Sequence, residues 1–250
     1  MLPRTLILRT AGTNCDLETA HAFTLAGATA ERVHLNRVLE SPRLMDDYQL
    51  LAIPGGFSYG DDINSGRIFA NQIVHHLKDA FRRFVDAGKP IIGICNGFQV
   101  LVKTDLLPGP LAGQSGQTAT LTNNASHRFT DLWVKLHVQP KSRCIWTRGL
   151  EALDLPVAHG EGKFVPASEP IRRALWDASQ VAVTYSDGTN PNGSTDDIAG
   201  VCDSTGLIFG LMPHPERYVT KLQHPAWSSQ GGDSDGAGLA VFRNAVAHIA

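Results

Sequence analysis

The chain has 250 residues with a formal net charge of −2, and 42% of its residues are apolar. A chain of this length and composition can bury one sizeable core, so we expect residues 1–250 to form a single domain. No basic stripe points to nucleic acid or an anionic membrane, and no apolar run reaches the roughly 18 residues that a membrane helix needs. We therefore expect a cytoplasmic protein without a nucleic-acid or membrane partner.

The first half of the sequence predicts strands that alternate with helices. Short β-rich or apolar runs predict strands at 5–10, 29–35, 48–54 and 90–95. Helical patterns lie at 15–27, 69–85 and 96–107, the second with apolar residues at steps of three or four. Strands that are apolar on both faces and alternate with helices predict an α/β fold, in which helices flank a mainly parallel sheet.

The second half is richer in strands. It predicts them at 131–139, 155–160, 163–166, 180–186, 198–203 and 207–213. Turn signals at Asp187-Gly188 and Asn192-Gly193 separate several of these strands, which predicts antiparallel hairpins added to the sheet. Residues 228–238 form a flexible loop by composition, and residues 239–249 predict a last helix.

Four cysteines are scattered along the chain: Cys15, Cys95, Cys144 and Cys202. They form no C-x-x-C pair, which disfavours a zinc site, and we expect no metal in this chain. A disulfide framework is also disfavoured, because the chain is neither small nor apparently secreted. Three of these thiols are expected to be small buried apolar groups. Cys95 is the exception.

Cys95 lies in the sequence "GICNGFQVL" (93–101), between Gly93 and Gly97, where a predicted strand turns into a predicted helix. G-x-C-x-G has the form of a nucleophile elbow with sulfur in place of the hydroxyl. Glycines on both sides remove Cβ atoms that would clash in the tight turn. The helix N-terminus favours the nucleophilic thiolate, and the Asn96 N–H can bind an oxyanion.

A candidate base follows the apolar strand at 207–213. In "MPHPER" (212–217), His214 and Glu216 are two residues apart, so in an extended segment their side chains point the same way. Glu216 can then hold one imidazole nitrogen while the other faces Cys95, as in catalytic triads. The alternative is a solvated turn made rigid by Pro213 and Pro215.

A third motif, "IPGGFSYGDD" (53–62), also follows a strand. It lacks the glycine spacings of dinucleotide and P-loop sites, so phosphate binding is disfavoured. Adjacent Gly55 and Gly56 allow backbone N–H groups to approach a ligand closely, and Gly56 or Phe57 can donate the second oxyanion hydrogen bond. The alternative is a plain glycine turn.

Together these stretches resemble class I glutamine amidotransferases, and most closely the family of glutaminase subunits of phosphoribosylformylglycinamidine synthase. The motifs "GFSYGD", "CNGFQ" and "PHPER" are the most specific to that family, and the similar stretches span residues 9–217. The resemblance implies a flavodoxin-like three-layer fold, a triad of Cys95, His214 and Glu216, and help from Gln99 in holding glutamine. Nothing is carried over to residues 112–127.

The resemblance also implies a function in purine biosynthesis. Cys95 attacks the side-chain amide of L-glutamine, a glutamyl thioester forms, and ammonia passes to a synthetase subunit that converts formylglycinamide ribonucleotide to its amidine. The chain carries no cofactor of its own; ATP and Mg²⁺ are expected on the synthetase, together with a small accessory subunit in the complex. "HGEGKF" (159–164) is a candidate lining of the junction, the alternative being a solvated turn.

Two competing functions remain open. A stand-alone cysteine hydrolase, such as a γ-glutamyl hydrolase, shares the elbow and the histidine but needs no synthetase. A docking or regulatory subunit that has lost its chemistry is disfavoured by the intact set of Cys95, His214 and Glu216.

Overall fold

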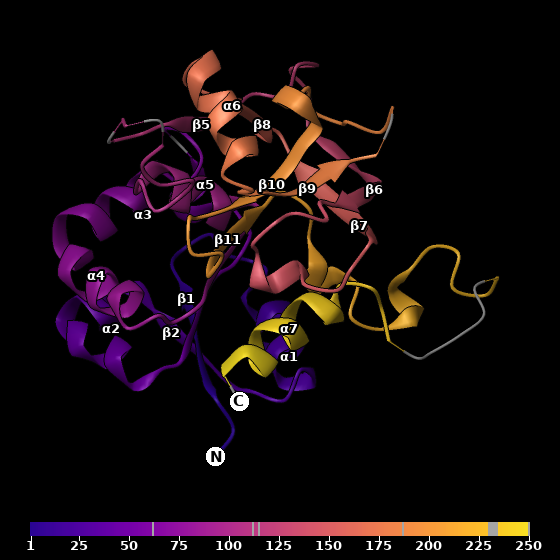
Figure 1. Cartoon of the computed structure of the whole chain (residues 1–250). Coiled ribbons are helices and arrows are strands. Elements are labelled where there is room, and N and C mark those ends of the chain that lie inside the picture. Colours follow the sequence, from indigo (N-terminus) through magenta and orange to yellow (C-terminus); the bar gives the residue numbers. More distant parts are fainter. Residues whose placement is uncertain (62, 112, 115, 187, 230–234, 250) are drawn as a thin grey trace.

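The computed structural model describes residues 1–61, 63–111, 113–114, 116–186, 188–229 and 235–249. A nine-stranded mixed sheet runs through the molecule with helices packed against it (Figure 1). Its strand order is β2-β1-β3-β4-β11-β10-β9-β6-β7, so strands from both halves of the chain share one sheet.

Five adjacent strands are parallel: β2 (Thr29–His34), β1 (Arg4–Arg9), β3 (Leu50–Ile53), β4 (Ile91–Ile94) and β11 (Ile208–Leu211). All residues of β3, β4 and β11 are buried, as expected for strands covered on both faces. The predicted parallel part of the sheet is confirmed.

The remaining strands of the sheet are antiparallel: β10 (Ile198–Cys202), β9 (Val181–Tyr185), β6 (Thr130–Val138) and β7 (Ala152–His159). They confirm the predicted antiparallel addition. One detail of that prediction is wrong, because β8 (Lys163–Pro166) does not join the large sheet. It pairs with β5 (Ala119–Thr122), a strand that the sequence analysis missed, in a separate two-stranded sheet.

The helices are α1 (Asp16–Leu25), α2 (Leu35–Glu40), α3 (Arg67–Gln72), α4 (Lys78–Asp86), α5 (Asn96–Lys103), α6 (Glu169–Asp177) and α7 (Leu239–Ile249). In Figure 1, α1 and α7 lie together on one side of β1, and α3 and α4 lie on the other. Helix α5 packs on β3, β4 and β11, directly above the strands that carry the candidate site.

The single helix predicted over residues 69–85 is interrupted. A π-helical turn, Ile73–Leu77, separates α3 from α4. Apolar residues spaced by four advance about 40° past a full α-helical turn each time, and a wider π turn corrects this drift. Phe69, Ile73, Leu77 and Phe81 therefore all stay buried on one face.

Two other helix predictions need correction. Helix α5 ends at Lys103 rather than near residue 107, because Asp105 adopts a left-handed φ of +60°. Helix α6 was not predicted, although Ser168 caps its N-terminus by accepting the Ile171 N–H and Pro170 lies in its first turn. Of the predicted 228–238 loop, residues 230–234 lie outside the described part, as does Asp187 of a predicted turn.

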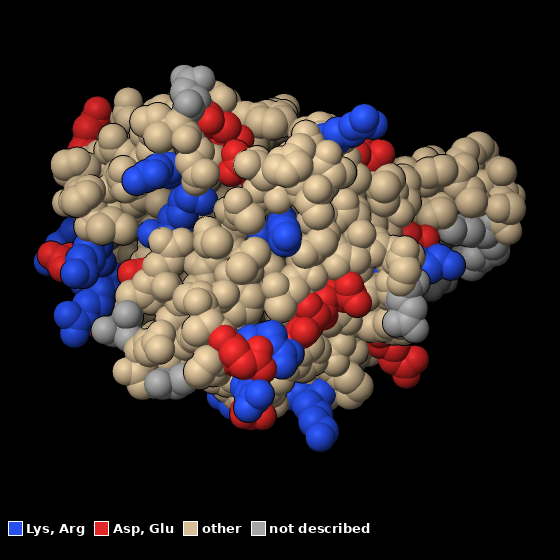
Figure 2. Space-filling view, turned by 90° about the horizontal axis from the view of Figure 1, so that it is seen from above, with Lys and Arg blue, Asp and Glu red and all other residues tan. Residues whose placement is uncertain are grey.

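Within the described residues, no helix is long and apolar enough to cross a membrane. Figure 2 shows basic and acidic side chains interspersed on the face seen from above, with uncharged surface between them.

Candidate active site

Three adjacent parallel strands end at one place on the sheet edge. Gly55 follows β3, Cys95 follows β4 and His214 follows β11, and these strands are neighbours in the order β3-β4-β11. The carboxyl ends of parallel strands are where open α/β sheets form their sites. The sheet order therefore brings together segments that are far apart in the sequence.

Cys95 occupies a strained turn between β4 and α5. Its φ is +52° and its ψ is −107°, an unusual conformation for a residue with a side chain, and its N–H donates to the Leu211 carbonyl at 2.8 Å. The thiol sits at the N-terminus of α5 and the residue is 5% exposed. A positive φ held by the surrounding sheet is the geometry of a nucleophile elbow.

The glycines on either side of Cys95 are required by close packing. A Cβ on Gly97 would lie 1.8 Å from the Ile53 carbonyl oxygen, and one on Gly93 would lie 2.5 Å from the Gly97 carbonyl oxygen. Helix α5 thus approaches β3 and β4 so closely that no side chain fits between them. This approach holds the N-terminus of α5 at the thiol.

His214 and Glu216 form a buried pair beside this elbow. Nδ1 of His214 and Oε1 of Glu216 are 2.6 Å apart, and the two side chains are 1% and 0% exposed. The pair does not form across an extended segment, as the sequence analysis assumed; Glu216 lies in a 3₁₀ turn, Pro215–Arg217, that folds back toward the imidazole. The side chains meet as predicted by a different local route.

The charge state of His214 follows from this environment. Burial alone lowers the pKa of its imidazole, but the negative charges of Glu216 and Cys95 outweigh burial and raise the pKa well above the ordinary value. Nε2 of His214 is buried without a hydrogen-bond partner among the described residues. This nitrogen is the one left to exchange protons with a ligand.

The glycine loop at 55–56 lies against both Cys95 and His214. A Cβ on Gly55 would lie 2.8 Å from His214 Cε1, 3.3 Å from Cys15 Sγ and 3.4 Å from Cys95 Cβ, so these three residues surround it. Gly56 has a φ of +139° and packs tightly against residues 12–14. Only glycine at each position allows this approach.

The loop also decides which N–H groups remain for an oxyanion. The Phe57 N–H donates to the Gly12 carbonyl at 2.9 Å, so Phe57 is not a free donor in this structure. The Gly56 N–H has no acceptor among the described residues. Gly56 and Asn96, the first residue of α5, are therefore the two candidate donors.

Asn96 and Gln99 are buried behind the thiol, where each bonds to the protein. Asn96 accepts the Ser58 N–H at 3.3 Å and donates to Gln99 Oε1 at 2.9 Å. Gln99 Nε2 donates to the Glu161 carbonyl at 2.6 Å. In this structure Gln99 ties α5 to the segment after β7, and its amide is not turned toward an open cavity.

Cys15 is a member of the site that the sequence analysis missed. It is fully buried, and its sulfur accepts a hydrogen bond from Arg217 at 3.1 Å. Ligand atoms of Cys15, His214 and Glu216 lie within 4.8 Å of one another. The positively charged Arg217 beside the sulfur and the Glu216 contact to Nδ1 argue that this cluster serves the centre itself and not a cation.

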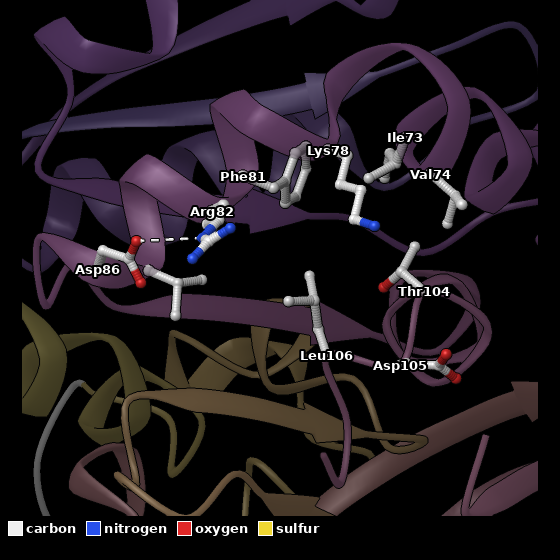
Figure 3. Close-up of a pocket in the computed structure, with 10 residues that line it drawn as sticks. Ile73, Val74, Lys78, Phe81, Arg82, Asp86, Thr104, Asp105 and Leu106 are labelled. Carbon is white, nitrogen blue, oxygen red and sulfur yellow. Dashed lines mark ion pairs between the residues drawn. The ribbon is translucent and has the colours of Figure 1, made fainter. Parts of the chain in front are cut away.

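A separate pocket of about 360 Å³ lies between α4 and the end of α5 (Figure 3). Its lining is mainly apolar, with Lys78 and Thr104 pointing into it and Arg82 paired with Asp86 at 3.6 Å. None of the predicted site residues lines it. The candidate site itself is closed, since Cys95 and His214 are almost fully buried.

Comparison with known proteins shows which family this chain is similar to. Residues 2–249 match the model of a CobB/CobQ-like glutamine amidotransferase domain. A phosphoribosylformylglycinamidine synthase subunit PurQ from Dehalococcoides mccartyi is 50% identical, covering 97% of this chain and 96% of that protein. A phosphoribosylformylglycinamidine synthase subunit PurQ from Methanococcus maripaludis is 38% identical, covering 100% of this chain and 98% of that protein.

Solved structures agree in fold. A chain of PurLQS from Thermotoga maritima superposes with a TM-score of 0.77 at 33% identity, with full coverage of both chains. A glutamine amidotransferase from the same organism has a TM-score of 0.56 at 17% identity over 92% of this chain and 82% of its own, a likeness in fold alone.

Proposed function

We propose that this chain, which belongs to the CobB/CobQ-like glutamine amidotransferase family, is the glutaminase subunit of a phosphoribosylformylglycinamidine synthase. It releases ammonia from L-glutamine for a separate synthetase subunit. The observation that carries this proposal is the strained Cys95 elbow beside the buried His214–Glu216 pair. Residues 1–250 act as one domain, a view supported by the continuous sheet and by the family match over residues 2–249.

The first half of the reaction forms a thioester. The Cys95 thiolate attacks the side-chain carbonyl carbon of glutamine, and the oxyanion accepts hydrogen bonds from the Gly56 and Asn96 N–H groups. His214, protonated because Glu216 and the thiolate raise its pKa, gives its Nε2 proton to the departing nitrogen. The C–N bond breaks, and neutral ammonia leaves.

The second half hydrolyses the thioester. Neutral His214 takes a proton from water, the hydroxide attacks the glutamyl carbon, and the C–S bond breaks to give glutamate and the Cys95 thiolate. Glu216 holds Nδ1–H of the imidazole, which keeps Nε2 aimed at the reacting atoms.

The acceptor chemistry belongs to partners. The Thermotoga maritima relative comes from an assembly named PurLQS, and we infer that this chain likewise joins a synthetase subunit and a small accessory subunit. ATP and Mg²⁺ are expected on the synthetase, and we infer that the complex acts in the cytoplasm.

An exposed aromatic pair beside the site supports docking there. Phe57, next to the glycine loop, is 45% exposed, and Phe129 is 56% exposed, with ring centroids 6.4 Å apart. Phe129 also lies 3.9 Å from the position of a Cβ on Gly160, close to the segment that covers the thiol. Exposed aromatic side chains are favoured anchors of protein interfaces.

The test is glutamate release by the purified chain, followed by addition of the synthetase with ATP and formylglycinamide ribonucleotide. A large rise in glutaminase rate on addition is the expected result. Full turnover by the isolated chain would favour the stand-alone γ-glutamyl hydrolase. Failure of a glutamine-like electrophile to label Cys95 in the assembled complex would favour a subunit without chemistry.

A further inference from the structure

The segment at residues 158–162 comprises the last two residues of β7 and the turn that leads to β8, and it passes directly over the candidate nucleophile. The Ala158 carbonyl oxygen lies 3.7 Å from Cys95 Sγ, and the Glu161 carbonyl accepts the Gln99 amide at 2.6 Å. Two carbonyl oxygens of this segment, those of Ala158 and Glu161, therefore face the thiol and its helix α5.

Two asparagines from distant loops hold this segment in place. Asn124 donates to the His159 carbonyl at 2.9 Å and accepts the Gly162 N–H at 3.0 Å. Asn192 donates to the Gly162 carbonyl at 2.9 Å and to the Tyr185 hydroxyl oxygen at 3.1 Å. Both asparagines are 1% exposed or less, so these bonds fix the segment from its buried side.

The His159 side chain also holds the segment, and we call Asn124, Asn192 and His159 together the clamp. Its Nδ1 is 3.1 Å from Asn124 Oδ1, and its ring leaves room only for glycine at 162, where a Cβ would lie 2.3 Å from Cε1. Burial and the nearby His214 lower the pKa of His159 to about 4, so the ring is neutral near pH 7. The clamp thus adds no positive charge beside the proton donor.

We propose that the Ala158 carbonyl recognises the amide –NH₂ of glutamine, and that Asn124, His159 and Asn192 are positioning residues that hold it there. This rests on the proposed glutaminase function. A substrate carbon placed about 3–3.5 Å from the sulfur for attack carries its amide nitrogen within reach of an acceptor 3.7 Å from that sulfur. The amide has two N–H donors, and the carbonyl accepts one of them.

The product lacks what the carbonyl recognises. The glutamate side chain is a carboxylate with no donor, and its negative oxygens are repelled by a carbonyl oxygen that cannot move away. The site therefore distinguishes amide from acid, because a polar group left facing the wrong partner is costly. Recognition by this carbonyl favours binding of glutamine and release of glutamate.

The experiment compares two substrates in the chain assembled with its synthetase subunit. Glutamine offers amide N–H donors, whereas the γ-methyl ester of glutamate has the same carbonyl carbon and none. Asn192→Ala loosens the clamp, and Tyr185→Phe removes only the hydroxyl that accepts from Asn192. Asn244→Ala is the matched control, since the Asn244 amide of α7 donates to the Trp146 and Arg148 carbonyls and not to this segment.

We expect Asn192→Ala to lower kcat/KM for glutamine about tenfold, with Tyr185→Phe showing a smaller loss, while kcat/KM for the ester stays near wild type. The ratio of the glutamate inhibition constant to the glutamine KM falls in parallel. Equal losses for amide and ester, or no loss in either variant, would overturn the proposal. A wild-type complex that hydrolyses the ester but not glutamine would instead refute the proposed glutaminase function.

Discussion

Replacement of Gly55 by alanine tests whether the loop after β3 positions the catalytic base. A methyl group there would lie 2.8 Å from His214 Cε1, about 0.6 Å short of ordinary van der Waals contact at 3.4 Å. The ring must shift to relieve this contact, and because Glu216 holds the neighbouring Nδ1 at 2.6 Å, the shift also disturbs the His214–Glu216 pair. Misplacement of a catalytic group by 1 Å can cost about 100-fold, so a shift of this size predicts about a tenfold loss in kcat.

The assay is glutamine hydrolysis by the assembled complex, with thermal unfolding of the same variant measured in parallel. Gly88→Ala is the matched control, because Gly88 has a φ of +68°, nothing lies within 4 Å of its Cβ position, and it is remote from the site at the end of α4. We expect Gly88→Ala to cost about 1–2 kcal/mol of stability with kcat retained. Wild-type kcat in Gly55→Ala, or an equal loss in Gly88→Ala, would refute this reasoning.

Three further outcomes are expected. Cys95→Ala abolishes glutamine-dependent synthesis by the complex but leaves ammonia-dependent synthesis, and loss of both with the complex intact would contradict the division of labour. Phe129→Ala weakens binding of the synthetase about tenfold or more, measured by titration, while Leu222→Ala, 72% exposed, leaves it unchanged; equal effects would remove the aromatic pair from the interface. Above pH 6.5, the ordinary pKa of histidine, His159 is neutral in the folded and the unfolded chain. As the pH falls from 6.5 toward the folded pKa of about 4, only the unfolded chain binds a proton at this residue. His159 therefore lowers the free energy of unfolding by about 3 kcal/mol between these two pH values. In denaturation experiments at several pH values, His159→Gln is expected to remove this loss of unfolding free energy. An unchanged slope of unfolding free energy against pH between 6.5 and 4 would contradict the buried neutral ring.

The strand-to-helix turns of the site were readable in the sequence, because each is a local pattern. An apolar run followed by G-x-C-x-G predicted β4, the elbow and α5, and the two prolines around His214 marked the end of β11. The sequence analysis placed each motif directly after a predicted strand, and the carboxyl ends of adjacent parallel strands meet at one edge of a sheet. In the structure β3, β4 and β11 are neighbours, so local patterns were enough to identify the motifs that meet there.

The partners of these motifs were not readable. Cys15 looked like one more buried thiol, and its contact with Arg217 joins residues 202 positions apart. The same holds for Asn124 and Asn192, whose motifs look like ordinary turns until β6, β7 and β9 bring them to the same segment. Periodicity and turn chemistry report on neighbours in sequence, whereas these bonds depend on strand order.

The glycines of this chain illustrate how a local motif and a distant contact combine. Gly93 and Gly97 were predicted to relieve the turn around Cys95, yet the atoms that exclude a side chain at Gly97 belong to Ile53 of the adjacent strand. At Gly55, the atom that excludes a side chain belongs to the imidazole ring of His214, which follows β11. Each glycine therefore marks a close contact among the ends of β3, β4 and β11 and the start of α5, and this packing holds the nucleophile, its base and the oxyanion donors in place. A site built in this way has little freedom to open by side-chain rotation alone. Since Cys95 is 5% exposed, a covering segment closes the site, and Glu161 of that segment is joined to Gln99 and to the Ser65 N–H, the latter at 3.4 Å. Because Asn124 and Asn192 hold the same segment from its buried side, contacts on both sides fix the Ala158 carbonyl beside the thiol.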